Sequence, residues 1–263
     1  MSNRENLDNK MAEISAIDDK RTKRPKHIPS DACILEATTL YHWAMEDKEA
    51  LMARGLSWEL VEDLIVRQEA LTEAEAAWNT QWRNRTAIYE EWNSASALAY
   101  ELRDRLAADF RFAFRNHPDL LPMVKRISNK KNHPTMIQDL NDLSYLGRTN
   151  RPLLEAIRFD MSLLEKAAQT STDMGSLLAN TIAALGKLCE VKKIRDQAYT
   201  HLKEAVDEIR RTGQYVFRRN KERYIGYISM HLRHAKSRQA RKAKEKHQEE
   251  KGTGKKNPEK KTF

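Results

Sequence analysis

The chain has 263 residues, of which 40% are hydrophobic and 32% are charged, and it contains only 8 Gly and 7 Pro. This composition favours helices over sheets, and no stretch approaches the roughly 18 apolar residues that a membrane span needs. The N-terminus lacks the apolar stretch of a secretory signal. Two isolated cysteines, Cys33 and Cys189, are typical of a reducing compartment, so we expect a cytoplasmic protein.

The net charge of +9 lies in the two ends of the chain. Residues 233–263 contain 12 Lys or Arg and 4 Glu, a net charge of +8, and residues 1–30 carry +2. The 202 residues between them carry −1. The basic composition therefore points to an acidic partner only for the ends, and the central part is electrically balanced.

The order of the elements predicts three parts. Residues 1–29 end in a dense cluster of basic residues and two prolines, which predicts a flexible basic arm. A helix over 30–54 follows, and Gly55 suits the left-handed residue after a helix end. We expect a helical bundle domain over 30–234 and a Lys/Arg-rich tail over 235–263.

Two long helical patterns dominate the predicted domain. Neither Gly nor Pro occurs between Trp58 and His117, and one heptad row of this stretch is apolar in seven of eight positions. This predicts one helix over about 58–115. A second pattern over about 161–218 contains Gly175, Gly186 and Gly213, where we expect kinks or a break. Shorter helices are predicted at 119–128, 135–146 and 221–234.

The two long patterns align at an offset of 103 residues. Ser57 then falls on Asp160 at the start, and Phe114 falls on Phe217 at the end, without a gap. Few positions are identical, so two readings stay open: an ancient tandem helical-hairpin repeat, or two independent amphipathic helices. The predicted fold class is therefore all-α, an elongated helical bundle built on two long helices with shorter helices, with disordered basic ends.

No residue pattern predicts catalysis. Residues 252–255, Gly-Thr-Gly-Lys, lack the strand and the Ser or Thr of a phosphate-binding loop. His231 and His234 share a helical spacing but have no third ligand, and Asp139 and Asp142 are explained as solvated or capping acids on an amphipathic helix. We expect no enzyme, no metal, no cofactor and no small-molecule substrate.

An aromatic row lies along the first long pattern, at Trp78, Trp82, Tyr89 and Trp92. Such a row at helical spacing is typical of a core that fills a wide seam between helices. The functional alternative is an exposed patch for a partner helix. Arg85 lies within the row and is expected to reach solvent or to pair with a carboxylate.

Aromatic and basic residues are interleaved over 215–224, directly before the basic tail. Such a segment can stack bases and neutralise phosphates. The alternative is a helix end that docks its aromatics into the bundle while its cations offset the helix dipole. The candidate nucleic-acid contacts are Arg218, Arg219, Lys221, Arg223, Tyr224, Arg233, Lys236, Arg238, Arg241 and Lys242.

Three stretches, 111–115 with 133–143 and 199–210, resemble a family of bacterial all-helical proteins of unknown function. The similarity extends over residues 30–232. It implies a helical domain, and it implies no activity and no functional residue.

These observations predict a non-enzymatic helical bundle protein that acts through protein contacts, with a partner or with itself. The alternative is a nucleic-acid-associated protein that uses residues 215–234 and the basic tail. Attachment of the tail to an anionic membrane surface is a third hypothesis. The sequence names neither the partner nor the oligomeric state.

Overall fold

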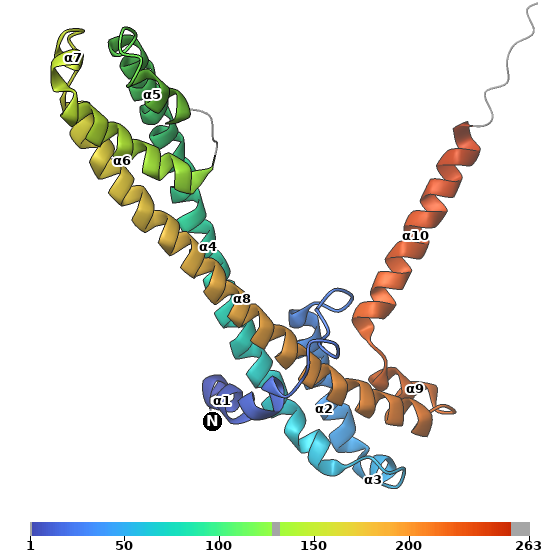
Figure 1. Cartoon of the computed structure of the whole chain (residues 1–263). Helices are drawn as coiled ribbons and strands as arrows, with labels where there is room; N and C mark the ends of the chain where they lie inside the picture. Colours follow the sequence, from blue (N-terminus) through green and yellow to red (C-terminus); the bar gives the residue numbers. More distant parts are fainter. Residues whose placement is uncertain (1, 128–131, 254–263) are drawn as a thin grey trace, which may run out of the picture. The chain divides into compact units, whose positions relative to one another are not determined.

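A computed structural model describes residues 2–127 and 132–253, with side chains described as far as Glu245 (Figure 1). Within these ranges the chain forms α-helices and one short 3-10 helix, without a strand. In chain order they are α1 (Asn3–Ser15), α2 (Ser30–Glu46), α3 (Lys48–Met52), α4 (Trp58–Ala113), α5 (Leu121–Ile127), α6 (His133–Thr149), α7 (Arg151–Glu155), α8 (Ser162–Val216), α9 (Lys221–Tyr224), η1 (Ile225–Tyr227) and α10 (Met230–Thr253). The predicted all-α bundle is confirmed.

Both long helices are continuous. The break that we expected in the second long helix does not occur, because α8 runs without interruption through Gly175, Gly186 and Gly213. Each glycine in a helix interior costs about 1 kcal/mol relative to alanine, which the packing of a 55-residue helix outweighs. Gly213 has a packing role, since a Cβ atom there would lie 2.0 Å from the ring of Tyr227.

Two shorter predicted helices are divided. The helix expected over 30–54 stops at Asp47, whose backbone leaves the helical region, and continues as α3 before Gly55 at φ +85°. The helix expected over 221–234 is interrupted after η1, where Ile228 is extended and a new helix begins at Met230.

The predicted flexible arm is wrong for residues 3–15, which form α1. Ser2 and Glu5 cap this helix reciprocally, each side chain bonding to the other's backbone N–H. Leu7 and Ile14, seven residues apart, are buried in the core. The sequence did not predict this helix, because only two of its apolar residues, Leu7 and Ile14, are buried and the rest of the segment is mostly polar.

The predicted disordered tail also begins as a helix, because α10 extends to Thr253. Ala, Arg, Lys, Gln and Glu, which dominate this stretch, are strong helix formers. Gly254 and Lys255 of the loop-like Gly-Thr-Gly-Lys stretch lie outside the described residues.

The element boundaries support the tandem repeat. Adding 103 to the bounds of α2 gives those of α6, and adding 103 to the bounds of α3 gives those of α7. The ends of α4 and α8, Ala113 and Val216, also differ by 103. Even the positive φ angles correspond, at Gly55 and Arg158. We therefore interpret residues 30–127 as repeat 1 and residues 133–230 as repeat 2.

The contacts divide the expected single domain into two compact units. Unit 1 comprises the chain up to Trp78 and from Val191 onward, and unit 2 comprises Asn79–Glu190. The division cuts through both long helices. Each unit therefore contains the first half of one repeat's long helix and the second half of the other's.

Each of the two cores combines buried residues of both repeats. The core of unit 1 combines Leu40 and Leu64 of repeat 1 with Leu202 of repeat 2. The core of unit 2 combines Phe110 of repeat 1 with Leu140 of repeat 2. The two repeats thus complete each other's cores, as the two chains of a symmetric dimer do.

Corresponding acids make ion pairs across the repeats in both units. Glu36 on α2 pairs with Arg210 on α8, with Oε2 and Nη2 2.7 Å apart. Its counterpart Asp139 on α6 pairs with Arg103 on α4, with Oδ2 and Nη1 3.6 Å apart. The two arginines differ by one helical turn after the offset, so the acid has been kept while its partner has shifted.

His201 links the stability of unit 1 to pH. Its Nε2 lies 3.1 Å from Glu13 Oε2 of α1, and burial, together with the nearby Arg67, holds its pKa below the usual value. The unfolded chain therefore binds a proton first, and stability is lost as pH falls through about 6.5. We expect His201→Leu to lose less stability than the wild type between about pH 7.5 and about pH 5.5, in urea titrations monitored by circular dichroism. Equal losses in the two proteins would contradict this role.

Candidate interaction surfaces

Eight of the ten candidate nucleic-acid contacts are exposed. They are Arg218, Arg219, Lys221, Arg233, Lys236, Arg238, Arg241 and Lys242. The other two, Arg223 and Tyr224, are half-buried. Arg223 has a structural role, because its guanidinium lies 2.6 Å from Asp47 and 2.8 Å from Glu46 and covers the ring of Trp43 at 4.5 Å. Hydrogen bonds to these carboxylates raise its pKa.

Helix α10 packs on the bundle only at its start (Figure 1). The backbone N–H of His231 donates to Glu36, and every described side chain from Lys236 onward is exposed. Six Lys or Arg lie between Arg233 and Lys244, with no acidic residue among them. A helix without an apolar stripe has no face to bury, so its charge faces solvent on all sides.

An exposed aromatic ring carries a stacked arginine at the end of both long helices. Arg218 lies 4.6 Å from the ring of Tyr215 and donates to its carbonyl, and Arg115 lies 4.3 Å from the ring of Phe112 and does the same. The pairs correspond at the offset of 103. Both rings stay more than half exposed, so Tyr215 does not dock into the bundle. Phe217 of the same segment does dock, since it packs against the core of unit 1.

The aromatic row of α4 is divided between core and surface. Trp92 is buried against His133, and Trp78 is half-buried beneath Arg195, which also lies 3.6 Å from Glu75. Trp82 and Tyr89 are 47% and 44% exposed. Trp92 thus belongs to the core, as the sequence predicted for the row, whereas Trp82 and Tyr89 are exposed. A partner helix for these rings stays a prediction.

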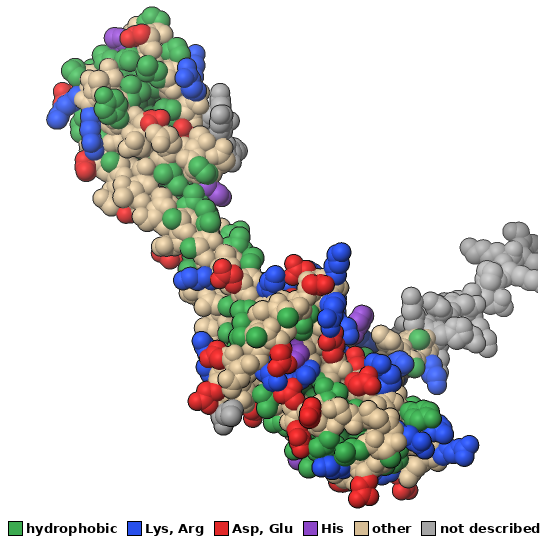
Figure 2. Space-filling view, turned by 60° about the horizontal axis from the view of Figure 1, so that its bottom comes forward, with side chains coloured by type: hydrophobic (Ala, Val, Ile, Leu, Met, Phe, Trp, Pro, Cys, Tyr) green, Lys and Arg blue, Asp and Glu red, His purple; other side chains and the backbone are tan. Residues whose placement is uncertain are grey.

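Arg85 lies between the two exposed rings, 6.0 Å from the centre of Trp82 and 5.0 Å from that of Tyr89. On α8 of the same unit, Ile182 and Leu185 are also exposed. Figure 2 shows hydrophobic side chains at the surface along the long helices. We call Trp82, Arg85 and Tyr89 the apolar surface of unit 2.

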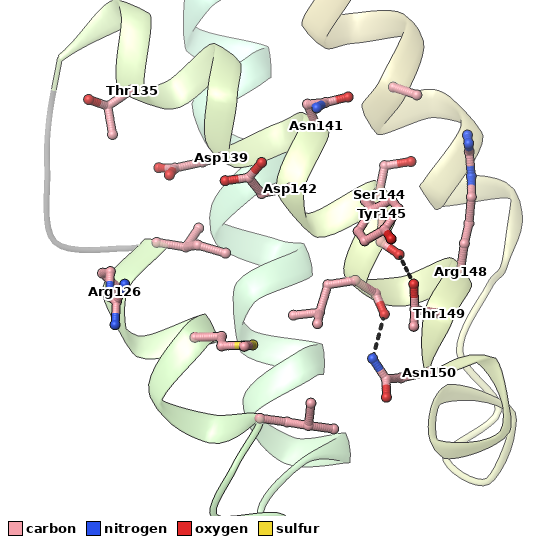
Figure 3. Close-up of a pocket in the computed structure, with 15 residues that line it drawn as sticks. Arg126, Thr135, Asp139, Asn141, Asp142, Ser144, Tyr145, Arg148, Thr149 and Asn150 are labelled. Atoms are coloured by element: carbon pink, nitrogen blue, oxygen red, sulfur yellow. Dashed lines mark hydrogen bonds between the residues drawn. The ribbon is translucent and has the colours of Figure 1, made fainter.

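A cavity of about 800 Å³ lies along α6 in unit 2 (Figure 3). Its apolar lining includes Met123 of α5 and Tyr145 of α6, and its polar lining includes Asp139 and Asp142 on one side of α6. Asp142 accepts a hydrogen bond from Gln138. The sequence predicted solvated or capping acids, but Asp139 is buried and pairs with Arg103, and Asp142 is the exposed acid of the two.

The repeat shows which residues stand at the corresponding place in unit 1. In unit 1 the residues that correspond to Leu146 and Leu120 are Trp43 and Arg223, which stack on each other. Gly226 lies so close to Trp43 that a Cβ atom would approach it to 2.3 Å. In unit 1 the stacked Trp43 and Arg223 thus stand where the smaller Leu146 and Leu120 line the cavity of unit 2.

The described side chains offer no clear catalytic or metal centre. No three His, Cys, Asp or Glu among them come together as metal ligands. Cys33 is buried, which raises the pKa of its thiol to about 11 and disfavours the reactive thiolate. None of the helices, over the described residues, combines the length and the apolar character that a membrane-spanning segment requires.

Comparisons with protein-family models, with curated proteins and with solved structures return no match for this chain. The resemblance to bacterial all-helical proteins stays a prediction.

Proposed function

We propose that the protein is a non-enzymatic helical bundle that acts through protein contacts, and that the apolar surface of unit 2 makes the main contact. The observation that carries this proposal is the exposure of Trp82 and Tyr89 with Arg85 held over both rings. Trp, Tyr and Arg are enriched among the interface residues whose truncation costs about 2 kcal/mol or more of binding free energy.

The arrangement favours binding because it is already ordered. Arg85 is half-buried and stacked, so little side-chain entropy remains to be lost when a partner covers it. Ile182 and Leu185 are further exposed apolar residues of the same unit. A partner would present apolar side chains to the rings and a carboxylate to Arg85.

Affinity purification with a matched variant tests this proposal. The tagged wild type should retain a protein partner, or a second copy of itself, that the double variant Trp82→Ser, Tyr89→Ser loses. The control is Phe112→Ser, Tyr215→Ser, which also removes two exposed rings and should retain the partner. Equal retention by both double variants, with melting temperatures unchanged, would overturn the proposal.

A nucleic-acid function is the second candidate, and α10 is the observation that favours it. If its six cations between Arg233 and Lys244 each contact a phosphate, the logarithm of the binding constant should fall with the logarithm of salt with a slope of about −5. Fluorescence anisotropy with a duplex and a single strand measures this slope. Deletion of residues 236–263 should abolish binding, and unchanged binding would contradict this function.

We also propose a cytoplasmic location. Cys33 and Cys189 are both free thiols, as is usual where the compartment is reducing.

A further inference from the structure

Helix α1 covers a face of unit 1 that the long helices form. Leu7 and Ile14 of α1 enter the core. On the α4 side, Lys10 lies 2.9 Å from Asp63. On the α8 side, Glu13 contacts His201. The residues of α8 that α1 and the segment after it cover are all buried: His201 contacts Glu13, Gln197 donates to the carbonyl of Ile17, and Thr200 accepts from the backbone N–H of Lys23.

The corresponding face of unit 2 has no such cover. The counterparts of Gln197, Thr200 and His201 at the offset of 103 are Ser94, Ala97 and Leu98 of α4, and all three are exposed. Leu98 is 68% exposed. Repeat 2 has no counterpart of α1, because α4 and the turn after it occupy the equivalent positions of the chain.

The residues of this face suit a helix. Ser94 and Ala97 have small side chains that let a helix backbone approach closely, and Leu98 provides an apolar knob beside them. On α8, Lys166 stands where unit 1 has Asp63, and it is exposed. We call Ser94, Ala97, Leu98, Glu101 and Lys166 the Leu98 face.

The residues that differ between the two corresponding faces indicate which kind of helix the Leu98 face binds. Lys10 of α1, which pairs with Asp63, would meet Lys166 on the Leu98 face, and like charges repel. Glu13, which contacts His201, would meet Leu98 instead and would lose its partner. Helix α1 of a second copy is therefore disfavoured on both counts. The Leu98 face instead fits a helix that carries an acidic residue at the position of Lys10 and an apolar residue at the position of Glu13.

We propose that the Leu98 face binds an amphipathic helix of a second protein, in the place that α1 occupies on unit 1. Glu101 corresponds to Glu204 at the offset of 103, and both are acidic. In unit 1, Glu204 pairs with Arg21, which follows the end of α1. The bound helix should therefore be followed by a basic residue. This inference deepens the proposed function, on which it rests, and adds a surface separate from Trp82 and Tyr89.

A designed peptide tests the proposal on the full-length protein. The probe is residues 2–17 with Lys10→Glu and Glu13→Leu, held helical by a staple between positions 8 and 12, which are exposed in α1. Fluorescence anisotropy should show saturable binding. The stapled peptide with the natural residues should bind at least about tenfold more weakly, because it loses one attraction and one apolar contact.

Two protein variants locate the site. Leu98→Glu should weaken binding of the probe at least about tenfold, whereas the control Leu35→Glu, at an equally exposed leucine of α2, should leave it unchanged. Lys166→Glu should reverse the preference for an acid at position 10 of the peptide. A stapled peptide that keeps Lys10 and carries only Glu13→Leu should then bind this variant more tightly than the probe does. Melting temperatures check that all three variants are folded.

No saturable binding of the probe, or equal binding to wild type and Leu98→Glu, would overturn the inference. The Trp82→Ser, Tyr89→Ser variant should bind the probe normally. Loss of the cellular partner by that variant, together with normal probe binding, separates the apolar surface from the Leu98 face. The proposed function can therefore fail while the Leu98 face still binds the probe, and the reverse also holds.

Discussion

Tyr227→Ala is expected to destabilise the protein by about 3–5 kcal/mol. The ring of Tyr227 is fully buried, stacks on Phe217 at 5.5 Å between ring centres, and fills the space that Gly213 leaves on α8. Its hydroxyl donates to Asp47, 2.7 Å away. Truncation would leave a cavity and remove this hydrogen bond from the core of unit 1.

Tyr215→Ala is the matched control, since it removes the same side chain from an exposed position on α8. It should change the unfolding free energy by less than about 0.5 kcal/mol. Urea unfolding monitored by circular dichroism measures both variants. Similar losses of stability in the two would show that η1 does not close the core of unit 1.

Glu36→Ala is expected to destabilise the protein by about 3 kcal/mol, because it leaves the buried guanidinium of Arg210 without its carboxylate. The same substitution removes the acceptor of the His231 backbone N–H and of the Ser229 hydroxyl, which hold the start of α10. The control is Glu208→Ala, which removes a largely exposed carboxylate paired with Arg211 and should cost less than about 1 kcal/mol.

The effect of Glu36→Ala should depend on pH. Burial of Glu36 favours its neutral form, but hydrogen bonds from His231 and Arg210 outweigh it and hold the pKa of the carboxyl below its usual value. A lowered acid pKa stabilises the fold above the unfolded pKa, and this contribution is lost as pH falls below about 4.5. The wild type and the variant should therefore differ less at low pH. A difference that stays constant from neutral pH to about pH 3 would contradict the role of this carboxylate.

The sequence predicted the long helices well because their signals are local. An unbroken stretch without Gly or Pro and a regular apolar row identified α4 from residue 58 onward. The glycines of α8 misled us, because one glycine costs a helix interior only about 1 kcal/mol and does not break a long packed helix. Gly213 packs on Tyr227, whereas nothing lies within 4 Å of a Cβ atom at Gly175 or Gly186. Helix α1 was missed because its buried face consists of few residues and its stability comes from unit 1.

The candidate surfaces were predictable in part. The exposure of the basic residues on α10 followed from their charge, but the pairing of Arg223 with Asp47 joins residues 176 positions apart, and no local pattern indicates such a contact. The Leu98 face could not be found from sequence, because it is defined by the cover that its counterpart at His201 receives from α1.

The internal repeat is the feature on which most of these conclusions depend. The alignment at an offset of 103 was only one of two readings of the sequence, and few identical residues supported it. Matching boundaries of α2 with α6 and of α3 with α7 now support it with structure. The reciprocal ion pairs of Glu36 and Asp139 show why both repeats are needed, since each acid finds its arginine in the other repeat.

Cleavage between the repeats tests most directly whether the two repeats complete each other's cores. A protease site inserted between Ile127 and Asn132 allows the folded full chain to be cut into its two halves. Size-exclusion chromatography without denaturant should show the two fragments eluting together, with the helical signal and the melting temperature close to those of the uncut protein. Separation into two fragments, each with its own cooperative unfolding transition, would show that each repeat has its own core and would contradict the account.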